Sequence, residues 1–201
     1  MGGFFCEMLG TSGPLVAQST RKANTYWDSI LKQALELSVQ EHKIVPFLKS
    51  AGNDEKVLDS PGVDIPTVSL TRSPYKEYHS SEDNYDLINE KYLHDARDVV
   101  QTFFDLMEED YVPSMNQPGP IFLSGHDLYP NWEKDPSELP RWLSFLDIMY
   151  AIDGERSLLE IAHDTKHSYA NVKYWCDAFA SKNLITKRKH ILGLRHSSKH
   201  Q

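Results

Sequence analysis

The hydrophobic and polar positions in the first part of the chain follow two patterns, and each predicts one kind of element. Short apolar runs bounded by glycine or proline predict buried strands at residues 3–9, 45–48 and 65–70. Apolar residues at helical spacing predict one helix over residues 24–39 and a longer one over residues 93–107. Strands that alternate with helices indicate an α/β layer structure.

The run at residues 3–9 reads as a central strand that is buried on both faces. A central strand needs a neighbour on each side, so its place at the start of the chain suggests that further sequence lies upstream. We expect a half-sheet of this kind to leave a strand edge open, and another chain could pair with that edge.

The pattern changes after the proline-rich segment at residues 113–120. Residues 142–150 carry one apolar helical face. Ser157 and Glu160 form a capping box that begins a second, short helix, and Ser168 begins a third helix that is followed by a terminal strand. Three short helices and a strand predict a winged-helix domain of the α+β class.

These patterns divide the chain into four parts. We predict an α/β domain, a linker, a winged-helix domain and a tail, over residues 1–112, 113–140, 141–196 and 197–201.

Composition narrows the classes of function. A chain of 201 residues with 40% hydrophobic content can form one ordinary domain or two small ones. The formal net charge of -8 argues against generic binding to nucleic acid, although residues 182–201 carry lysine and arginine and no acid. Cys6 and Cys176 fall in different predicted domains, so we expect no disulfide and a reducing compartment. No run has the length of a membrane span and the start lacks the features of a signal peptide, which predicts a cytoplasmic protein with no membrane contact.

The densest cluster of reactive groups lies at residues 78–84. A histidine in a polar loop, here His79, can bind zinc through one ring nitrogen while a carboxylate such as Asp83 orients the other. The hydroxyl of Tyr78 could donate to a developing oxyanion. The alternative interpretation is structural, because polar loops that precede helices use the same residue types for turns and caps.

The sequence also resembles the two-zinc aminopeptidase superfamily, and specifically an aminopeptidase-like branch associated with polysaccharide biosynthesis that ends in a winged helix. The resemblance covers residues 2–112. The segments that carry it are Gly2-Gly3-Phe4-Phe5-Cys6-Glu7-Met8-Leu9-Gly10, Gly52-Asn53-Asp54-Glu55, Pro61-Gly62-Val63-Asp64-Ile65-Pro66 and Tyr75-Lys76-Glu77-Tyr78-His79-Ser80-Ser81-Glu82-Asp83-Asn84. It implies part of a zinc-aminopeptidase-like sheet of the phosphorylase/hydrolase type, with flanking helices, followed by the winged-helix domain.

The resemblance also implies roles for individual residues. It makes His79 the last metal ligand, Tyr78 the group that polarises the substrate carbonyl, and Asp83 the residue that orients His79. Glu7, at the end of a predicted strand, would hold the other zinc ion, and its alternative role is that of a plain carboxylate at the sheet edge. The loop that lines the site in the family corresponds here to Asn53, Asp54 and Glu55, a set that turn formation explains equally well.

The chain departs from the family in its ligand set. Such enzymes need an early histidine, a bridging aspartate, a glutamate base and a further glutamate ligand, all of which come before the strand that begins this chain. Two ligands cannot build a pair of zinc sites, because catalytic zinc keeps three protein ligands and an open position. We therefore expect a parent protein that binds two zinc ions and hydrolyses amino-terminal peptide or amide bonds, and no activity from this chain alone.

Two other functions are compatible with the sequence. In the first, the winged helix contacts DNA or a protein, and protein contact is favoured because the predicted recognition helix carries few positive charges. In the second, the chain is an inactive scaffold whose open strand edge pairs with a second copy or with a missing amino-terminal half.

Overall fold

The computed structural model describes residues 1–39, 41–50, 52–129 and 133–189. These residues divide into two compact units, residues 1–109 and 110–189. The predicted tail at residues 197–201 and the last part of the predicted domain at residues 141–196 lie outside the described residues. In the part of the chain that the structure describes, no helix combines the length and the hydropathy needed to cross a membrane.

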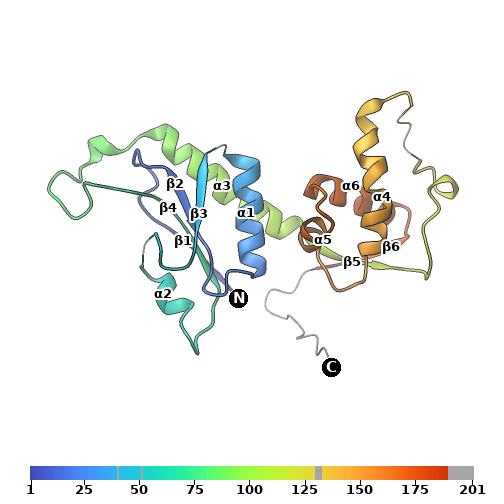
Figure 1. The fold of residues 1–201 in the computed structure, drawn as a ribbon, viewed down its shortest axis with the longest axis horizontal. Coiled ribbons are helices and arrows are strands. Elements are labelled where there is room, and N and C mark those ends of the chain that lie inside the picture. Colours follow the sequence, from blue (N-terminus) through green and yellow to red (C-terminus); the bar gives the residue numbers. More distant parts are fainter. Residues whose placement is uncertain (40, 51, 130–132, 190–201) are drawn as a thin grey trace. The chain divides into compact units, whose positions relative to one another are not determined.

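The first unit is built on a four-stranded mixed sheet with the order β1-β4-β2-β3 (Figure 1). Its strands are β1 (Gly3–Cys6), β2 (Leu15–Gln18), β3 (His42–Val45) and β4 (Thr67–Arg72). Strands β1 and β4 are parallel, β2 and β3 are parallel, and β2 runs antiparallel to β4. The sheet and the helices that flank it confirm the predicted mixture of α and β structure.

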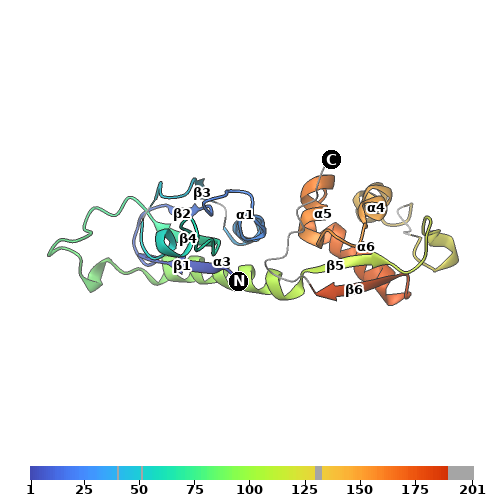
Figure 2. The same cartoon turned by 90° about the horizontal axis from the view of Figure 1, so that it is seen from below.

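Helix α1 (Tyr26–Ser38) covers one face of the sheet, and α3 (Glu90–Glu109) packs against α1 and against Phe4 of β1 (Figures 1 and 2). The Phe103 ring of α3 lies 4.7 Å from the ring of Phe4 on β1 and 5.7 Å from the ring of Trp27 on α1, measured between ring centroids. The Trp27 ring packs directly against Gly2, where a Cβ atom would lie 2.0 Å from the ring. Only glycine fits at this position without a shift of the ring. This face is therefore the apolar core of the unit.

The other face of the sheet carries a row of polar residues beside the apolar Phe5 and Val16, and we call it the polar face. Side chains alternate along a strand, so Thr67, Ser69 and Thr71 of β4 point away from the face that packs on α1 and α3. All three are nevertheless buried. The short helix α2 (Glu55–Leu58) contacts β4 and β1 on this side. The polar face is thus enclosed by protein, and its hydroxyl groups need internal partners.

Three predictions about strands need correction. Strand β1 lies at an edge of the described sheet and is only half-buried, whereas the sequence predicted a central strand. The strand predicted at residues 45–48 ends at Val45, because Pro46 has no N–H to donate and Leu48 takes a φ of 57°. Strand β2 was not predicted.

The second unit contains three helices and a two-stranded antiparallel sheet. The helices are α4 (Leu139–Ala151), α5 (Leu158–Thr165) and α6 (Tyr169–Ser181), and the strands are β5 (Tyr111–Met115) and β6 (Ile185–Lys189). The Ser157–Glu160 capping box that begins α5 is confirmed. Residues 113–115 form part of β5, so they are not part of a linker as predicted. The rings of Phe145, Trp175 and Phe179 form the centre of this unit.

Cys6 and Cys176 are both free and belong to different units, as expected.

Candidate functional site

Glu7 follows directly after β1, and its side chain is turned toward the polar face of the sheet. Its backbone N–H donates to the Leu70 carbonyl over 3.2 Å, which extends the pairing of β1 with β4 by one residue. The Glu7 carboxylate accepts a hydrogen bond from the Asn53 side-chain amide through Oε2, over 2.7 Å. Its other oxygen, Oε1, is buried and has no hydrogen-bond partner among the described residues.

Asn53 is held by a chain of buried polar groups. Its backbone N–H donates to Oε2 of Glu55 over 3.1 Å, and Oε1 of Glu55 accepts from the side-chain amide of Gln18 over 3.2 Å. The side-chain oxygen of Gln18, Oε1, in turn accepts hydrogen bonds from the backbone N–H groups of Lys49 and Ser50. Glu55 is completely buried and Gln18 nearly so, and we call these four residues, Glu7, Asn53, Glu55 and Gln18, the Glu7 network.

The pKa of Glu7 is raised above its usual value. Burial is the largest cause, and the nearby charge of Glu55 raises the pKa further, while the hydrogen bond from Asn53 works in the opposite direction. A buried polar atom without a partner costs about 1–3 kcal/mol. Oε1 of Glu7 is therefore an oxygen for which a cation or a proton donor would be favourable.

The other predicted site residues lie in the loop between β4 and α3. The His79 ring stacks on the Tyr78 ring, with centroids 3.9 Å apart, and His79 has a φ of 60°, in the left-handed region. The Asp83 carboxylate accepts a hydrogen bond from the hydroxyl of Tyr75. No hydrogen bond of Asp83 to His79 occurs within the described part of the chain. Tyr78, His79 and Asp83 are all exposed.

The structure thus brings together Glu7, Asn53 and Glu55, while Tyr78, His79 and Asp83 lie in the exposed loop, where Asp83 contacts Tyr75. Asp54 is exposed and precedes α2, where its carbonyl accepts from the N–H groups of Val57 and Leu58. Among the described residues, no group of three or more His, Cys, Asp or Glu side chains could hold a metal ion. The donor chemistry at Glu7 fits a zinc ligand, since Oε1 is a buried oxygen without a partner, but the described residues do not make up a complete set.

Two residues of this region were not predicted from the sequence. Gln18 was missed because β2 was not predicted, and its partner Glu55 is far away in sequence. Thr71 was also not predicted, although the sequence contains a signal for it. Hydroxyl residues alternate with other residues along Thr67–Arg72. Alternate positions lie on one face of a strand, so this pattern indicates a polar face.

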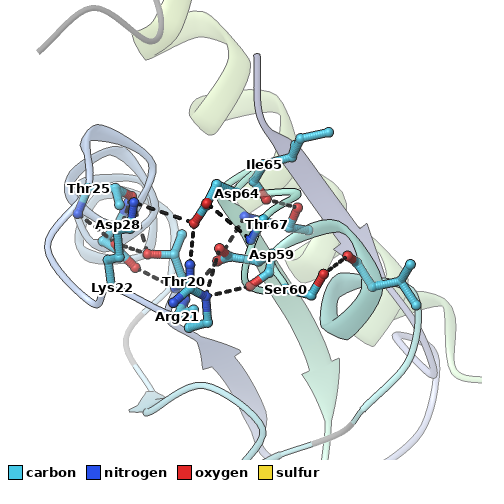
Figure 3. A network of polar contacts seen from close by, with 12 residues as sticks. Thr20, Arg21, Lys22, Thr25, Asp28, Asp59, Ser60, Asp64, Ile65 and Thr67 are labelled. Atoms are coloured by element: carbon cyan, nitrogen blue, oxygen red, sulfur yellow. Dashed lines mark hydrogen bonds and ion pairs between the residues drawn. The ribbon is translucent and has the colours of Figure 1, made fainter.

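A second polar cluster joins the loop after β2 to the loop that precedes β4 (Figure 3). The Arg21 guanidinium donates to the Asp59 carbonyl over 2.7 Å and pairs with Asp64, and the Arg21 backbone N–H donates to the Asp59 carboxylate. Asp28 accepts from the backbone N–H and the hydroxyl of Thr20. The charged groups of this cluster have partners within it, so its role is to tie these loops together.

The chain is similar to one described protein family and to one curated protein. Residues 1–110 match the family described as "Domain of unknown function (DUF4910)". A protein of Clostridium acetobutylicum described as "Putative polysaccharide biosynthesis protein with aminopeptidase-like domain" is 25% identical over 187 residues, which cover 91% of this chain and 43% of that protein.

One solved structure has a similar fold. It is described as a "putative peptidase" from Clostridium acetobutylicum, and it matches with a TM-score of 0.73 and 24% identity over 92% of this chain and 41% of that chain. At this identity the likeness shows the fold alone. The chain spans less than half the length of both relatives.

Proposed function

The chain belongs to the DUF4910 family through residues 1–110, and we propose that it is part of a zinc-dependent aminopeptidase-like hydrolase that cleaves amino-terminal peptide or amide bonds. In this proposal Glu7 and His79 are zinc ligands, and residues outside this chain complete the two zinc sites. The 201 residues alone are then inactive, because catalytic zinc takes three protein ligands and the described residues offer no such group.

The observation that carries the proposal is the state of the Glu7 carboxylate. One oxygen is fixed by Asn53, and the other is buried without a partner, although the carboxylate lies next to the acidic Glu55. A carboxylate with a purely structural role at a sheet edge would turn both oxygens to solvent or to donors. A bound cation would satisfy Oε1 and offset the proximity of the two acids. The words "aminopeptidase-like" and "peptidase" in the descriptions of the two Clostridium relatives agree with this role.

The remaining predicted residues have supporting roles in this proposal. Zinc supplies Lewis-acid chemistry and lowers the pKa of a bound water. Tyr78, which precedes His79, donates a hydrogen bond from its hydroxyl to the carbonyl oxygen of the substrate. Asp83 orients His79 in the metal-bound form, in place of the hydrogen bond that it now accepts from Tyr75. Asn53, Asp54 and Glu55 line the site next to Glu7.

Zinc binding by residues 1–201 tests the ligand assignment. We expect weak one-to-one binding of Zn²⁺, measured by competition with a chelating dye, and loss of that binding in both Glu7→Gln and His79→Ala. The matched controls are Glu108→Gln and His94→Ala, which change exposed residues of α3. Binding that survives Glu7→Gln would remove the basis of the proposal.

The resemblance assigns Glu7 and His79 to different zinc ions, and limited proteolysis tests whether the two share one ion in the 201 residues, whose described part forms no complete site. Lys76 is exposed and lies close to His79 in sequence, so a zinc ion shared with Glu7 should slow tryptic cleavage after Lys76. Cleavage after Lys134, in the second unit, is the internal control. The protection should be absent in Glu7→Gln. Release of an amino acid from an aminoacyl anilide by the 201 residues alone would contradict the expected inactivity.

A second proposal concerns the second unit, whose three helices and antiparallel strand pair fit a winged helix. We propose that it contacts protein and not DNA, because Lys173 within the third helix and Lys187 on β6 both pair with Asp177. Phosphate contact requires cations that are available to the nucleic acid. Retention on duplex DNA that falls steeply with salt would refute this assignment.

A further inference from the structure

Strand β4 presents a row of hydroxyl groups on the polar face of the sheet, and one of them differs from the others. The Thr67 hydroxyl donates to the Ile65 carbonyl over 3.0 Å, and the Ser69 hydroxyl accepts from the Gln18 amide over 3.4 Å. Thr71, which is 1% exposed, has a hydroxyl without a hydrogen-bond partner in the described part of the chain. The last hydroxyl of the row is therefore a buried polar group whose hydrogen-bonding capacity is unused among the described residues.

The strand register places Thr71 beside Glu7. Cys6 pairs with Leu70 in the parallel ladder, and the hydrogen bond from the Glu7 N–H to the Leu70 carbonyl continues the same register. Glu7 and Thr71 are thus lateral neighbours on adjacent strands, about 4.8 Å apart along the hydrogen-bonding direction. Both side chains belong to the polar face, because Phe4, three positions before Glu7, packs on the opposite face against Phe103.

Two adjacent buried oxygens without partners are unfavourable for the protein on its own. Each costs about 1–3 kcal/mol, and a water or a cation that contacts both would remove both costs. The Glu7 network also fixes which oxygen of Glu7 is offered, since Asn53 occupies Oε2 and is itself held by Glu55 and Gln18. The pair is therefore arranged before any ligand arrives.

We propose that Oε1 of Glu7 and the hydroxyl of Thr71 bind one shared ligand, a hydrated divalent cation, and that Asn53 is a positioning residue for Glu7. This inference rests on the proposed function, because it takes Glu7 as a metal ligand. It adds Thr71, which the resemblance does not assign to the site, and it gives Asn53 the role of orienting the Glu7 carboxylate. A threonine hydroxyl can donate to a carboxylate or accept from a cation-bound water, so its chemistry suits this position.

Zn²⁺ binding and thermal unfolding of residues 1–201 test the inference, with variants of Thr71 that separate its hydroxyl from its shape. Thr71→Val replaces the hydroxyl with a methyl group of similar size. We expect it to weaken Zn²⁺ binding about five- to tenfold, while Thr71→Ser keeps wild-type affinity. Asn53→Ala should weaken binding about tenfold or more, as for other groups that orient a metal ligand. Without zinc, Thr71→Val should unfold at the same or a higher temperature than the wild type, because it removes an unpaired buried hydroxyl.

Thr67→Val is the matched control, because the Thr67 hydroxyl already has a partner. It should lower stability without a selective loss of zinc affinity.

The possible results separate this inference from the proposed function. If Glu7→Gln abolishes zinc binding and Thr71→Val leaves it unchanged, the shared ligand is refuted and the proposed function stands. If Thr71→Ser binds as weakly as Thr71→Val, the hydroxyl is not responsible and the inference is refuted. Zinc binding that is absent, or independent of Glu7, overturns both the metal role of Glu7 and the inference built on it.

Discussion

Glu55 offers the most direct test of the Glu7 network, because its side chain is completely buried and accepts hydrogen bonds through both oxygens. In Glu55→Ala, the Asn53 N–H loses its acceptor, which costs about 1–3 kcal/mol. The Gln18 amide loses one of two partners and keeps Ser69, so its share is about 1 kcal/mol. The lost burial of a methylene adds about 0.8 kcal/mol. Removal of a charge near Glu7 works the other way, so we expect a net loss of about 2–4 kcal/mol.

Glu55→Gln keeps the shape and one acceptor oxygen, and we expect a smaller loss of about 1 kcal/mol. Urea unfolding followed by amide signals in NMR spectra measures the stability of each unit separately, since the two units give distinct signals. Glu108→Ala, at an exposed position on α3, should change stability by less than about 0.5 kcal/mol. An equal loss in Glu55→Ala and Glu55→Gln, or no loss in either, would refute the reasoning that the hydrogen bonds of Glu55 organise this face.

Three further predictions concern packing, capping and charge. Gly2→Ala should destabilise the first unit by about 1–3 kcal/mol, because the new Cβ would overlap the Trp27 ring; Gly52→Ala, which meets only ordinary contacts, is the control in urea unfolding. Ser157→Ala should cost about 1–2 kcal/mol in the second unit, because it removes the cap of α5, and circular dichroism on heating would detect it. Asp177→Asn should lower the stability of the second unit by about 0.5–1 kcal/mol at pH 7, because solvent screens a carboxylate that is 36% exposed. Burial raises the pKa of Asp177, but hydrogen bonds from two lysines and a tyrosine outweigh this effect and leave the pKa lowered. The extra stability of the wild type over Asp177→Asn should therefore be present above about pH 4 and vanish as the pH falls further.

The longer helices were predictable because their signals are local, whereas the four-residue helix α2 was not predicted. Apolar spacing identified α1 and α3, and the serines at positions 157 and 168 marked the starts of α5 and α6. Strand β2 was not predictable in the same way, since four buried residues after a glycine-proline turn carry no periodic signal. Its place depends on pairing with β3 and β4, which come later in the chain.

The candidate site shows the same division between local and distant signals. Glu7 entered through a resemblance, and nothing in its neighbourhood in the sequence indicates that Asn53 donates to it. The hydrogen-bonded partners of the Glu7 network are 37 and 46 residues apart, except for Asn53 and Glu55. Such contacts follow from the order of strands in the sheet, and that order is a tertiary property. The alternating hydroxyl groups of β4 were the one signal of a polar face that the sequence contained.

The protein holds one of the two proposed zinc ligands, Glu7, more firmly than the other, His79. This difference limits how tightly the chain can bind zinc. Glu7 is fixed by hydrogen bonds that lead to the backbone of two neighbouring segments. His79 lies in an exposed loop where the described hydrogen bonds of residues 75–84 join loop residues to one another. Fixing a backbone residue costs about 1–2 kcal/mol, so a metal that recruits His79 must also order part of this loop. In the proposed site Glu7 would bind zinc without that cost. Tight binding therefore requires contacts that hold the loop, and these have to come from residues beyond the Glu7 network.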